Sequence, residues 1–549
     1  MKTGKKILTI LLVSVLVMSA MALTGCTQEA SGETSYLRVG FSWPTEIDPA
    51  IGSDYSSSTA FTNLYDPLVY PTQEGVKPWI AEDWEASPDG KEYTFDIKEG
   101  VKFHSGNELT AEDVMFSMQR LKTIGEGYAY LFTSVNMNES EKIDDYTVKF
   151  VLDEPSGVFL STLVRLYIVD KEVVMNNLDE TADFQYPPNA DLGRTYLSTN
   201  DAGSGPYEVS EVVPQDHVNM KRFEDYWGEF AEDPADEYHM LALGEPSTER
   251  TMFSEGELEI TSQWLPYQII DSIVESEDGK EGAYPSGGLF YGMLNNKKKP
   301  LDDVHVRRAL AYSFDYETQI EEIFPASKLP KSVVPAVLAG AADIDLPRKD
   351  MEKAEEELRK SKYYPDIVEN PDDYEIECSW TASVSATEEV ALLMAEQAEK
   401  IGLQVDSQKY QWSSLIDAMA TEETSPHIAM VWVSAHYPEA GSILESRYAS
   451  DNADSWEQNE WLLNDTIDTL IDDALEEVDQ QTRYSLYDQI QKDVVEMCAS
   501  MFLHTQYSAH AYQSYVTWPQ VENVEEDAVP VMGYNIDARR ISVTPPNER

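Results

Sequence analysis

Residues 374–405 constrain the fold most, because they combine a strand, an amphipathic helix and the start of a second strand. The first seven residues, YEIECSW, have strand composition, and Val390, Met394 and Ala398 then recur at helical spacing before Gly402 ends the helix. A strand, a crossover helix and a strand in direct succession place the two strands in parallel in one sheet. The pattern therefore predicts an α/β or mixed α+β protein.

Further strands and helices are expected on both sides of this unit. Residues 110–121 should form a helix, since Thr110 can act as its N-cap and Asp113 can complete a capping box. The other expected elements are strands at 36–41, 93–97 and 146–151, a short helix at 61–65, and amphipathic helices at 467–478 and 486–497. The alternation of strands and helices indicates more than one domain.

Length and charge exclude several classes of protein. The 549 residues correspond to roughly two to four domains. The chain has 100 acidic and 40 basic residues and a formal charge of −60, so it offers no basic face for nucleic acid or for anionic lipid. Hydrophobic residues make up 42%, which is sufficient for a packed core. Beyond Cys26, the cysteines are Cys378 and Cys498, which are either buried thiols or a disulfide.

The N-terminus carries the features of a secretory signal. Three lysines precede an apolar stretch at 7–23, which is too short and too interrupted for a membrane-spanning helix. The stretch ends in Leu-Thr-Gly-Cys at 23–26, which resembles the lipobox of bacterial lipoproteins and implies cleavage before Cys26 and lipidation of this residue. An ordinary signal peptide is the alternative. Residues 1–25 are predicted to be a lipoprotein signal peptide and 26–35 a lipidated tether at the cell surface or periplasmic face.

The sequence lacks several common catalytic and metal-binding motifs. It contains neither HExxH nor GxxxxGK[ST], and Gly203-Ser204-Gly205 lacks the spacing of a nucleophile elbow. The eight histidines are scattered and have no carboxylate partner at helical spacing. We therefore expect no enzyme, no metal site and no cofactor.

Several segments keep one order between about residue 36 and residue 518. The most specific is DGKEYTFDIKEGVKFHSGNELTAEDVMFSMQRL at 89–121. The others are NLYDPLV at 63–69, PWIAEDWE at 78–85, GSGPY at 203–207, YWG at 226–228, FSEGELEI at 253–260, residues 295–312 with Pro300, Asp303, Val304, Arg307 and Ala309, and IDDA at 471–474. In this order they resemble the extracellular solute-binding proteins of family 5, the oligopeptide, dipeptide and nickel-binding group of ATP-driven importers.

The resemblance implies a two-lobed fold of the periplasmic-binding-protein type, with an extra inserted domain and a ligand cleft between the lobes. The implied parts are lobe I at 36–72, 203–284 and 515–549, inserted domain II at 73–202 and lobe III at 285–514. Most of the matched signature would be structural, with Asp89-Gly90 as a hairpin turn and His104 as a hydrogen-bonded loop residue.

The resemblance also implies the function. The chain would be a monomeric substrate-binding lipoprotein that captures an extracellular solute by hinged lobe closure and delivers it to the permease subunits of an ABC importer and their ATPases. It would contact the membrane only through its N-terminal lipid. The solute would be an oligopeptide or a related small molecule, with an oligosaccharide or a metal chelate as alternatives. A surface hydrolase and a sensory receptor are further alternatives.

One segment is expected to contact the ligand, namely residues 431–440 (VWVSAHYPEA). In peptide-binding members of the family, an acidic residue of the matching segment holds the peptide α-ammonium, and His436 stands where that residue is expected. A neutral imidazole is a poor partner for an ammonium group and a protonated one repels it. Glu439 is an alternative partner. The departure favours sugars, blocked peptides and metal chelates relative to free peptides.

The remaining candidates are aromatic residues near the expected lobe boundary. The full set of candidate ligand-binding residues is Tyr55, Trp264, Tyr291, Trp412, Trp432, His436, Tyr437 and Glu439. Each aromatic side chain alone can equally be a packing residue. The segment from Trp432 to Glu439 is the favoured part of the site.

Overall fold

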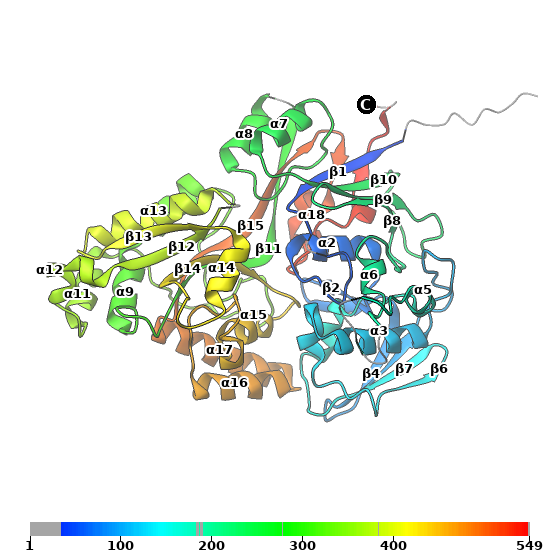
Figure 1. Cartoon of the computed structure of the whole chain (residues 1–549), viewed down its shortest axis with the longest axis horizontal. Helices are drawn as coiled ribbons and strands as arrows, with labels where there is room; N and C mark the ends of the chain where they lie inside the picture. The colour runs from blue at the N-terminus through cyan, green and yellow to red at the C-terminus, as the bar shows by residue number, and fades with distance from the viewer. Residues whose placement is uncertain are drawn as a thin grey trace, which may run out of the picture.

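The computed structural model describes residues 34–44, 46–182, 186, 190–276, 278–382, 384–546 and 549. The predicted signal segment and Cys26 lie outside these residues. Figure 1 shows two large bodies side by side, one containing β1 and α3 and the other containing α9 to α17. Within the described part of the chain, no helix is both long and apolar enough to cross a membrane.

Lobe I is built on a four-stranded sheet with the order β1-β10-β9-β8. Strand β1 (Tyr36–Phe41) is parallel to β10 (Glu237–Ala242) and confirms the first expected strand. Strand β9 (His217–Arg222) is antiparallel to both β10 and β8 (Tyr207–Val213).

Helix α2 (Tyr55–Leu64) packs against β8 within lobe I. It begins earlier in the sequence than the helix expected at 61–65. It starts at Tyr55 because the Asp54 side chain accepts a hydrogen bond from the Ser57 backbone and caps the first turn. The C-terminal end of α2 lies against Gly203 and Gly205 of the matched GSGPY segment. A Cβ atom on Gly203 would lie 1.8 Å from the Leu64 carbonyl oxygen, so only glycine allows this approach.

Domain II contains a second four-stranded sheet with the order β4-β5-β7-β6, which is antiparallel throughout. The strands are β4 (Ala81–Ala86), β5 (Glu92–Ile97), β7 (Thr147–Val151) and β6 (Glu141–Asp144). Strands β5 and β7 confirm two expected strands. Gly90 has a φ of +68°, and it forms the expected turn between β4 and β5.

Helix α3 (Ala111–Ile124) contacts the strands of domain II and has the expected capping box. Asp113 accepts hydrogen bonds from the Thr110 backbone and side chain. His104 is a hydrogen-bonded loop residue, as expected. Its Nδ1 lies 2.5 Å from an Asp201 carboxylate oxygen and its Nε2 2.9 Å from the Gly205 carbonyl oxygen.

The body of lobe III is a five-stranded sheet with the order β13-β12-β14-β11-β15. Strands β12 (Ile376–Thr381) and β13 (Val405–Tyr410) are parallel, and helix α13 (Ala386–Glu399) connects them, which confirms the predicted βαβ unit. Strand β14 (Ile428–Ser434) is parallel to β12 and antiparallel to β11 (Gly279–Leu294).

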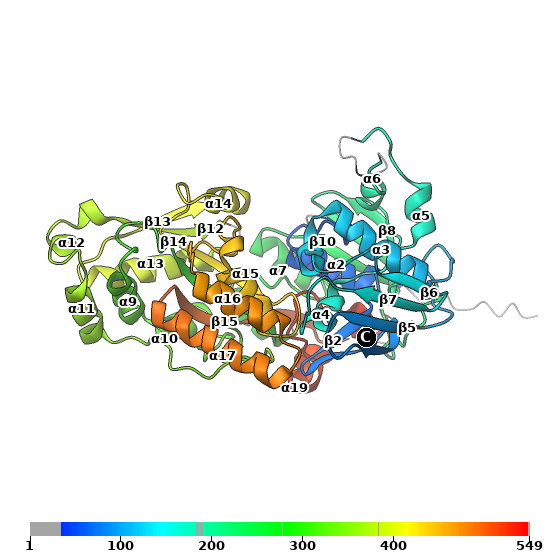
Figure 2. The ribbon, with the colours of Figure 1, turned by 90° about the horizontal axis from the view of Figure 1, so that it is seen from below.

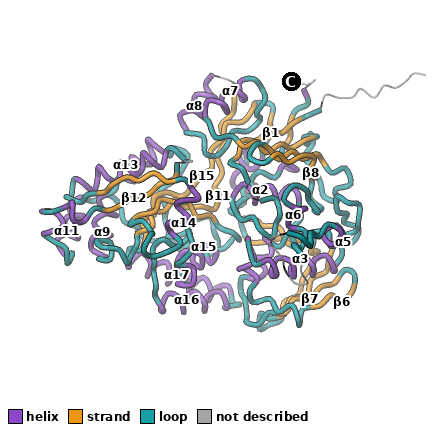
Figure 3. Tube along the Cα trace, viewed as in Figure 1, coloured by secondary structure: helices purple, strands orange, loops and turns teal. Residues whose placement is uncertain are grey.

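Helices flank this sheet, as Figure 3 shows. The two C-terminal ones confirm the expected apolar stripes. These are α16 (Asp465–Glu476) and α17 (Gln480–Met497). The other helices of this lobe are α9 (Val304–Ser313), α10 (Tyr316–Thr318), α11 (Met351–Lys360), α12 (Asp366–Glu369), α14 (Trp412–Met419) and α15 (Gly441–Tyr448).

Strands β11 and β15 (Ser500–Gln513) extend from the sheet of lobe III to lobe I (Figure 1). Residue Ala511 of β15 accepts a backbone hydrogen bond from Thr261, close to β1. The remaining elements are β2 (Val69–Thr72), β3 (Gly75–Pro78), α4 (Phe159–Thr162), α5 (Lys171–Asn176), α6 (Arg194–Leu197), α7 (Pro246–Ser254), α8 (Tyr267–Ser276), β16 (Val516–Thr517), α18 (Pro519–Glu522), α19 (Val524–Asp527) and β17 (Ser542–Val543). The exact domain bounds stay a prediction.

The two remaining cysteines are free thiols. Cys378 on β12 and Cys498 after α17 are both buried and form no disulfide. This settles the open alternative in favour of buried thiols. Burial raises the pKa of the Cys498 thiol to about 11 and raises that of Cys378 further, so neither is a reactive thiolate at neutral pH.

Domain II and lobe III touch each other directly. The Gly157 backbone N–H donates to the Leu475 carbonyl oxygen at the end of α16 over 2.8 Å. Tyr437, from the segment after β14, packs into the hydrophobic core of domain II. Seen from below in Figure 2, α16 and α17 lie at the side of lobe III that faces α4 and β2. The structure is therefore a closed arrangement of the two bodies.

Gly157→Ala should prevent this closure. An added Cβ would lie 1.9 Å from the Glu477 carbonyl oxygen, which is backbone and cannot move aside alone. We expect a larger radius of gyration in solution scattering than for the wild type, with an unchanged circular dichroism spectrum. Gly244→Ala is the matched control, because nothing lies within 4 Å of its Cβ position. Equal radii for the Gly157 variant and the wild type would contradict the prediction.

Candidate functional site

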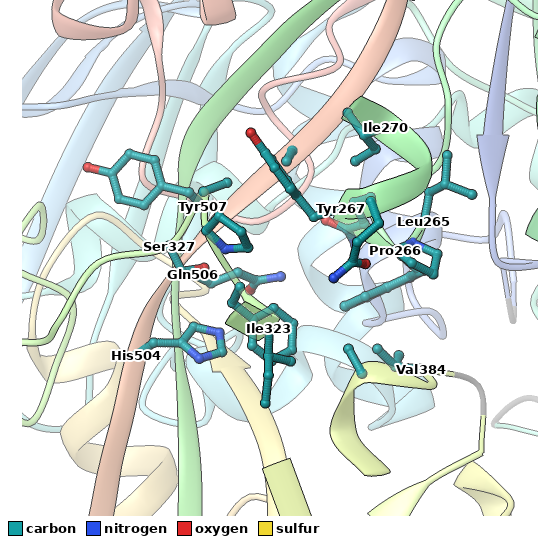
Figure 4. A pocket seen from close by; sticks show the side chains of 18 of the residues that line it. Leu265, Pro266, Tyr267, Ile270, Ile323, Ser327, Val384, His504, Gln506 and Tyr507 are labelled. Atoms are coloured by element: carbon teal, nitrogen blue, oxygen red, sulfur yellow. The ribbon is translucent and has the colours of Figure 1, made fainter. Parts of the chain in front are cut away.

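A cavity of about 120 Å³ opens where lobe III meets the connection to lobe I (Figure 4). Its walls come from the segment before and within α8, the end of the π-helical turn Gln319–Ile323 that follows α10, the loop after this turn, the start of α13, β14 and β15. The aromatic side chains that line it are Trp264, Tyr267, Phe324, Trp432 and Tyr507. The hydrogen-bonding ones are Gln263, Gln268, Ser327, Ser385, His504 and Gln506.

The aromatic wall is held rigidly. The Trp432 ring stacks on the buried Phe290 ring, with ring centroids 4.1 Å apart and an interplanar angle of 24°. Trp264 packs against the same indole at 5.5 Å. The Trp432 Nε1 atom donates a hydrogen bond to His504 Nε2 over 3.2 Å. Two of the three predicted tryptophans, Trp264 and Trp432, thus belong to one preformed wall, which costs little entropy when a ligand binds.

His504 is neutral and has a defined tautomer. Burial lowers its pKa to about 3. The indole N–H can only donate, so Nε2 of His504 is the acceptor and Nδ1 carries the proton. The Gln319 side-chain amide lies 2.6 Å from Nδ1, and only its oxygen can accept from this N–H. With the amide turned in this way, the oxygen, which otherwise has no hydrogen-bond partner among the described residues, is paired. The imidazole orients the indole and adds no charge.

The cavity has almost no formal charge. Among its described lining residues, Glu389 is the only acid and no lysine or arginine is present. A carboxylate on a bound molecule would find no ion-pair partner here, whereas amide and apolar groups would find complementary surfaces.

A second part of the site lies where domain II touches the end of β14. Nδ1 of His436 is hydrogen-bonded to the Tyr130 hydroxyl. Arg165, also from domain II, donates from Nε to the His436 carbonyl oxygen over 2.7 Å. Burial and the Arg165 charge lower the pKa of His436 to about 3, so its ring is neutral. The predicted segment therefore lies at the closed contact, and its histidine carries no charge.

Glu439 already has partners inside lobe III. One carboxylate oxygen accepts hydrogen bonds from Nε and Nη2 of Arg483 over 3.1 and 3.0 Å, and the other accepts from the Tyr487 hydroxyl. Both oxygens are thus occupied by the protein. This carboxylate is used to fix the segment after β14 on α17.

The other predicted residues are distributed around these two parts. Tyr55 bonds to the Tyr284 hydroxyl in lobe I over 2.6 Å, and Tyr291 is fully buried and donates to the Val333 carbonyl oxygen. Trp412 is 37% exposed at the start of α14 and packs edge-on against Trp456. None of these three predicted residues lines the cavity. The fully buried Tyr437 belongs instead to the closed contact described above.

Several residues that line the site were not predicted from the sequence. The clearest signal lay in β15, where polar residues alternate along an otherwise apolar strand. His504, Gln506, Ser508 and His510 all have 8% exposure or less. Such a period-two pattern in a buried strand indicates a polar internal surface. Tyr130 carries no comparable signal, because the sequence does not show which loop of domain II faces lobe III.

Two bodies joined by two long strands, with a cavity and a closed contact between their parts, define a two-lobed binding protein. The sequence comparisons agree. Residues 75–455 match the family of bacterial extracellular solute-binding proteins, family 5 Middle. The chain belongs to this family, and it is therefore the substrate-binding protein of an ATP-driven importer that works with permease and ATPase subunits.

Relatives and solved structures show how far the likeness extends. The probable D,D-dipeptide-binding periplasmic protein DdpA of Escherichia coli (strain K12) is 26% identical over 84% of this chain and 86% of its own length. The oligopeptide-binding protein OppA of Bacillus subtilis (strain 168) is 23% identical over 97% and 98%. The structure of DppA from Helicobacter pylori in complex with the peptide STSA superimposes with a TM-score of 0.77, covering 94% and 99% of the two chains at 21% identity.

Glu445 should make the stability of the protein depend on pH. Burial, together with the nearby carboxylates of Asp472 and Glu457, raises its pKa to about 7 from an ordinary value of 4.5. The folded state then binds a proton that the unfolded state has released. The free energy of unfolding therefore falls as the pH rises from about 4.5 to about 7, by roughly 3 kcal/mol at most.

The variant Glu445→Gln removes this titration. We expect its unfolding midpoint to drop less than that of the wild type between pH 5 and pH 8 in thermal scans. Glu399→Gln, on the exposed side of α13, makes the same charge change and should follow the wild type. Parallel curves for wild type and Glu445→Gln would contradict the assignment.

Proposed function

We propose that this protein binds short peptides between lobe I and lobe III and presents them to the importer. The observation that carries the proposal is the preformed cavity wall of Trp264 and Trp432, which is ringed by glutamine and serine side chains and bears no cation. Amide groups and apolar side chains of a peptide match such a surface. The dipeptide- and oligopeptide-binding names of the relatives support the same class.

The volume of the cavity limits how much of a ligand it can hold in the closed arrangement. Pockets for a whole drug-sized ligand have volumes of roughly 300–1,000 Å³. A cavity of about 120 Å³ accommodates one side chain or one terminal group. The rest of the peptide would then extend along β14 toward the contact of His436 with Tyr130. Binding would favour closure by making contacts with both bodies at once.

The proposal includes an anchor at the N-terminus. Cys26 would carry the lipid after cleavage of residues 1–25, and the polar stretch that follows it would act as the tether. The body of the protein would then lie outside the cytoplasm as a monomer. Mass spectrometry of the protein from membranes, compared with Cys26→Ser, tests the anchor, and equal masses apart from the substitution would contradict it.

A thermal-shift screen tests the peptide class. Binding of a ligand to the folded state raises the unfolding midpoint, and the rise increases with ligand concentration. We expect at least one di- to pentapeptide of a mixed panel to give such a rise, whereas oligosaccharides and metal chelates in the same screen should not. A panel in which only the sugars or chelates stabilise the protein would overturn the peptide proposal.

Trp432→Ala tests the location of the site with the peptide found in this screen. Loss of the central aromatic contact should weaken its affinity at least tenfold, equivalent to about 1.4 kcal/mol, in isothermal titration calorimetry. Trp84→Ala on β4 of domain II removes the same side chain far from the cavity and is the control. Unchanged affinity in Trp432→Ala would place the ligand elsewhere.

A further inference from the structure

One buried side chain of the cavity has a donor without a protein partner. Gln506 on β15 lines the cavity and is 8% exposed. Its side-chain oxygen accepts a hydrogen bond from the Ser286 hydroxyl over 3.0 Å, and no described residue accepts from its side-chain nitrogen. Figure 4 shows this side chain extending from β15 into the cavity. A donor at this depth requires an acceptor, and a ligand can supply one in place of water.

Ser327 lies beside Gln506 on the same wall. Lys328 and Thr505 exchange backbone hydrogen bonds, which places Ser327 on the segment next to β15. Ser327 is buried, lines the cavity, and its hydroxyl has no hydrogen-bond partner among the described residues. His504, the other buried polar side chain among the described lining residues, has both ring nitrogens occupied. The buried donors that remain for a ligand therefore belong to Gln506 and Ser327.

Gln506 also lies opposite an irregularity of β11. The neighbours of Gln506 in β15 pair with Pro285 and Leu289, so the three residues 286–288 of β11 lie opposite Gln506 alone. The pairing of β11 with β14 ends in the same stretch, at Gly288. Bulges of this kind bend a strand and redirect its side chains. The bulge thus marks the point where β11 leaves the sheet of lobe III on its way to lobe I.

The bulge is packed against the Gln506 side chain and against two other segments. A Cβ atom on Gly288 would lie 2.7 Å from the Gln506 amide oxygen, so the side chain crosses directly over this glycine. Gly287 has a φ of +72°, and its Cβ position lies 2.2 Å from the Pro530 carbonyl oxygen in the C-terminal segment. The Gly287 carbonyl oxygen accepts from the Ala435 backbone N–H over 3.0 Å, directly after β14. The amide of Gln506 therefore touches the element at which three segments meet.

The two ends of this amide have different surroundings. Ser286 holds the oxygen end at the bulge, and the nitrogen end is directed into the cavity. An amide N–H binds an acceptor such as the carbonyl oxygen of a peptide group. A carboxylate is also an acceptor, but it would be buried in a cavity whose described lining contains no lysine or arginine. A neutral carbonyl oxygen does not carry this cost.

We propose that Gln506 donates a hydrogen bond from its side-chain amide to a backbone carbonyl oxygen of the bound peptide, next to Ser327, and that this contact fixes the bulge of β11 through Ser286. The inference rests on the proposed peptide function and deepens it. A ligand that holds the Gln506 amide in one orientation also holds its bond to Ser286. Binding then favours one backbone arrangement of the strand that joins the lobes, and a change of a few backbone angles there is sufficient for hinge motion.

N-methylacetamide, a small model of one peptide group, tests the contact directly. In protein labelled with nitrogen-15 glutamine, the Gln506 side-chain signals are those that disappear in Gln506→Glu. We expect at least one of them to move saturably downfield in a titration with N-methylacetamide, while the signals of Gln119, exposed on α3, stay in place. Sodium acetate at the same concentrations should shift the Gln506 signals less. Gln506 signals that do not move with N-methylacetamide overturn the inference.

The same titration tests the connection to the bulge. Gly287 and Gly288 are the only adjacent glycines in the sequence, so glycine labelled with carbon-13 at its carbonyl and with nitrogen-15 gives one paired signal, that of Gly288. This signal should move with the same midpoint as Gln506. In Ser286→Ala the Gln506 signals should still move and the Gly288 signal should not. A Gly288 signal that is unchanged in the wild type overturns the connection to the bulge.

Peptide affinity provides a second test. Gln506→Glu keeps an acceptor for Ser286 and removes the donor, so the affinity for a peptide found in the thermal-shift screen should fall about tenfold or more in isothermal titration calorimetry. Gln119→Glu makes the same change on exposed α3 and should retain the affinity. Should Gln506→Glu not fold, Gln506→Met provides the same comparison and the same assignment.

The outcomes separate this inference from the peptide function. Retained affinity in Gln506→Glu shows that the amide does not donate to the ligand, which overturns the inference and leaves the peptide function standing. If no peptide of the panel binds, the peptide function fails, and the N-methylacetamide titration still decides whether Gln506 binds a peptide group. Saturable movement that is absent for Gln119 supports the contact, and its absence for Gln506 overturns it.

Discussion

The closed structure depends on one buried guanidinium, that of Arg165. The residue comes from domain II and is fully buried, yet it has no carboxylate partner among the described residues. It donates to the carbonyl oxygens of His436 and Met532, and its charge lies over the Tyr128 ring at 4.6 Å. Domain II, lobe III and the C-terminal segment therefore meet at one side chain. A buried charge held only by carbonyl dipoles and aromatic faces is stable when all of them are in place.

The same interaction explains the state of the site histidine. Arg165 binds the His436 carbonyl oxygen, and its positive charge, together with burial, opposes protonation of the imidazole. The imidazole is then free to accept from Tyr130, which a charged ring could not do through Nδ1. Closure thus fixes both the position of the segment after β14 and its charge. A neutral histidine side chain at position 436 leaves the Arg165 guanidinium bonded to the backbone carbonyl oxygen of this residue. A carboxylate side chain at position 436 would attract the guanidinium to itself.

Much of the fold could be predicted because it follows from local periodicity. The βαβ unit from β12 to β13, the capping box of α3 and the stripes of α16 and α17 depend on residues close in sequence. The site is different, because its residues come from segments far apart. Trp432 and Trp264 were predicted from their place in or near the matched segments, but the sequence does not show which residues each predicted side chain contacts. Glu439 could not be linked to Arg483, nor His436 to Tyr130, until the packing of the lobes was known.

The carboxylates behind the closed contact make the closed structure sensitive to pH. Burial raises the pKa of both Glu445 and Glu457, and the charge of Glu457 adds to the rise at Glu445. Such desolvation disfavours the ionised form of both carboxylates, and protonation removes this cost. The overall charge of −60 acts at longer range, because it raises the local concentration of cations around the whole protein.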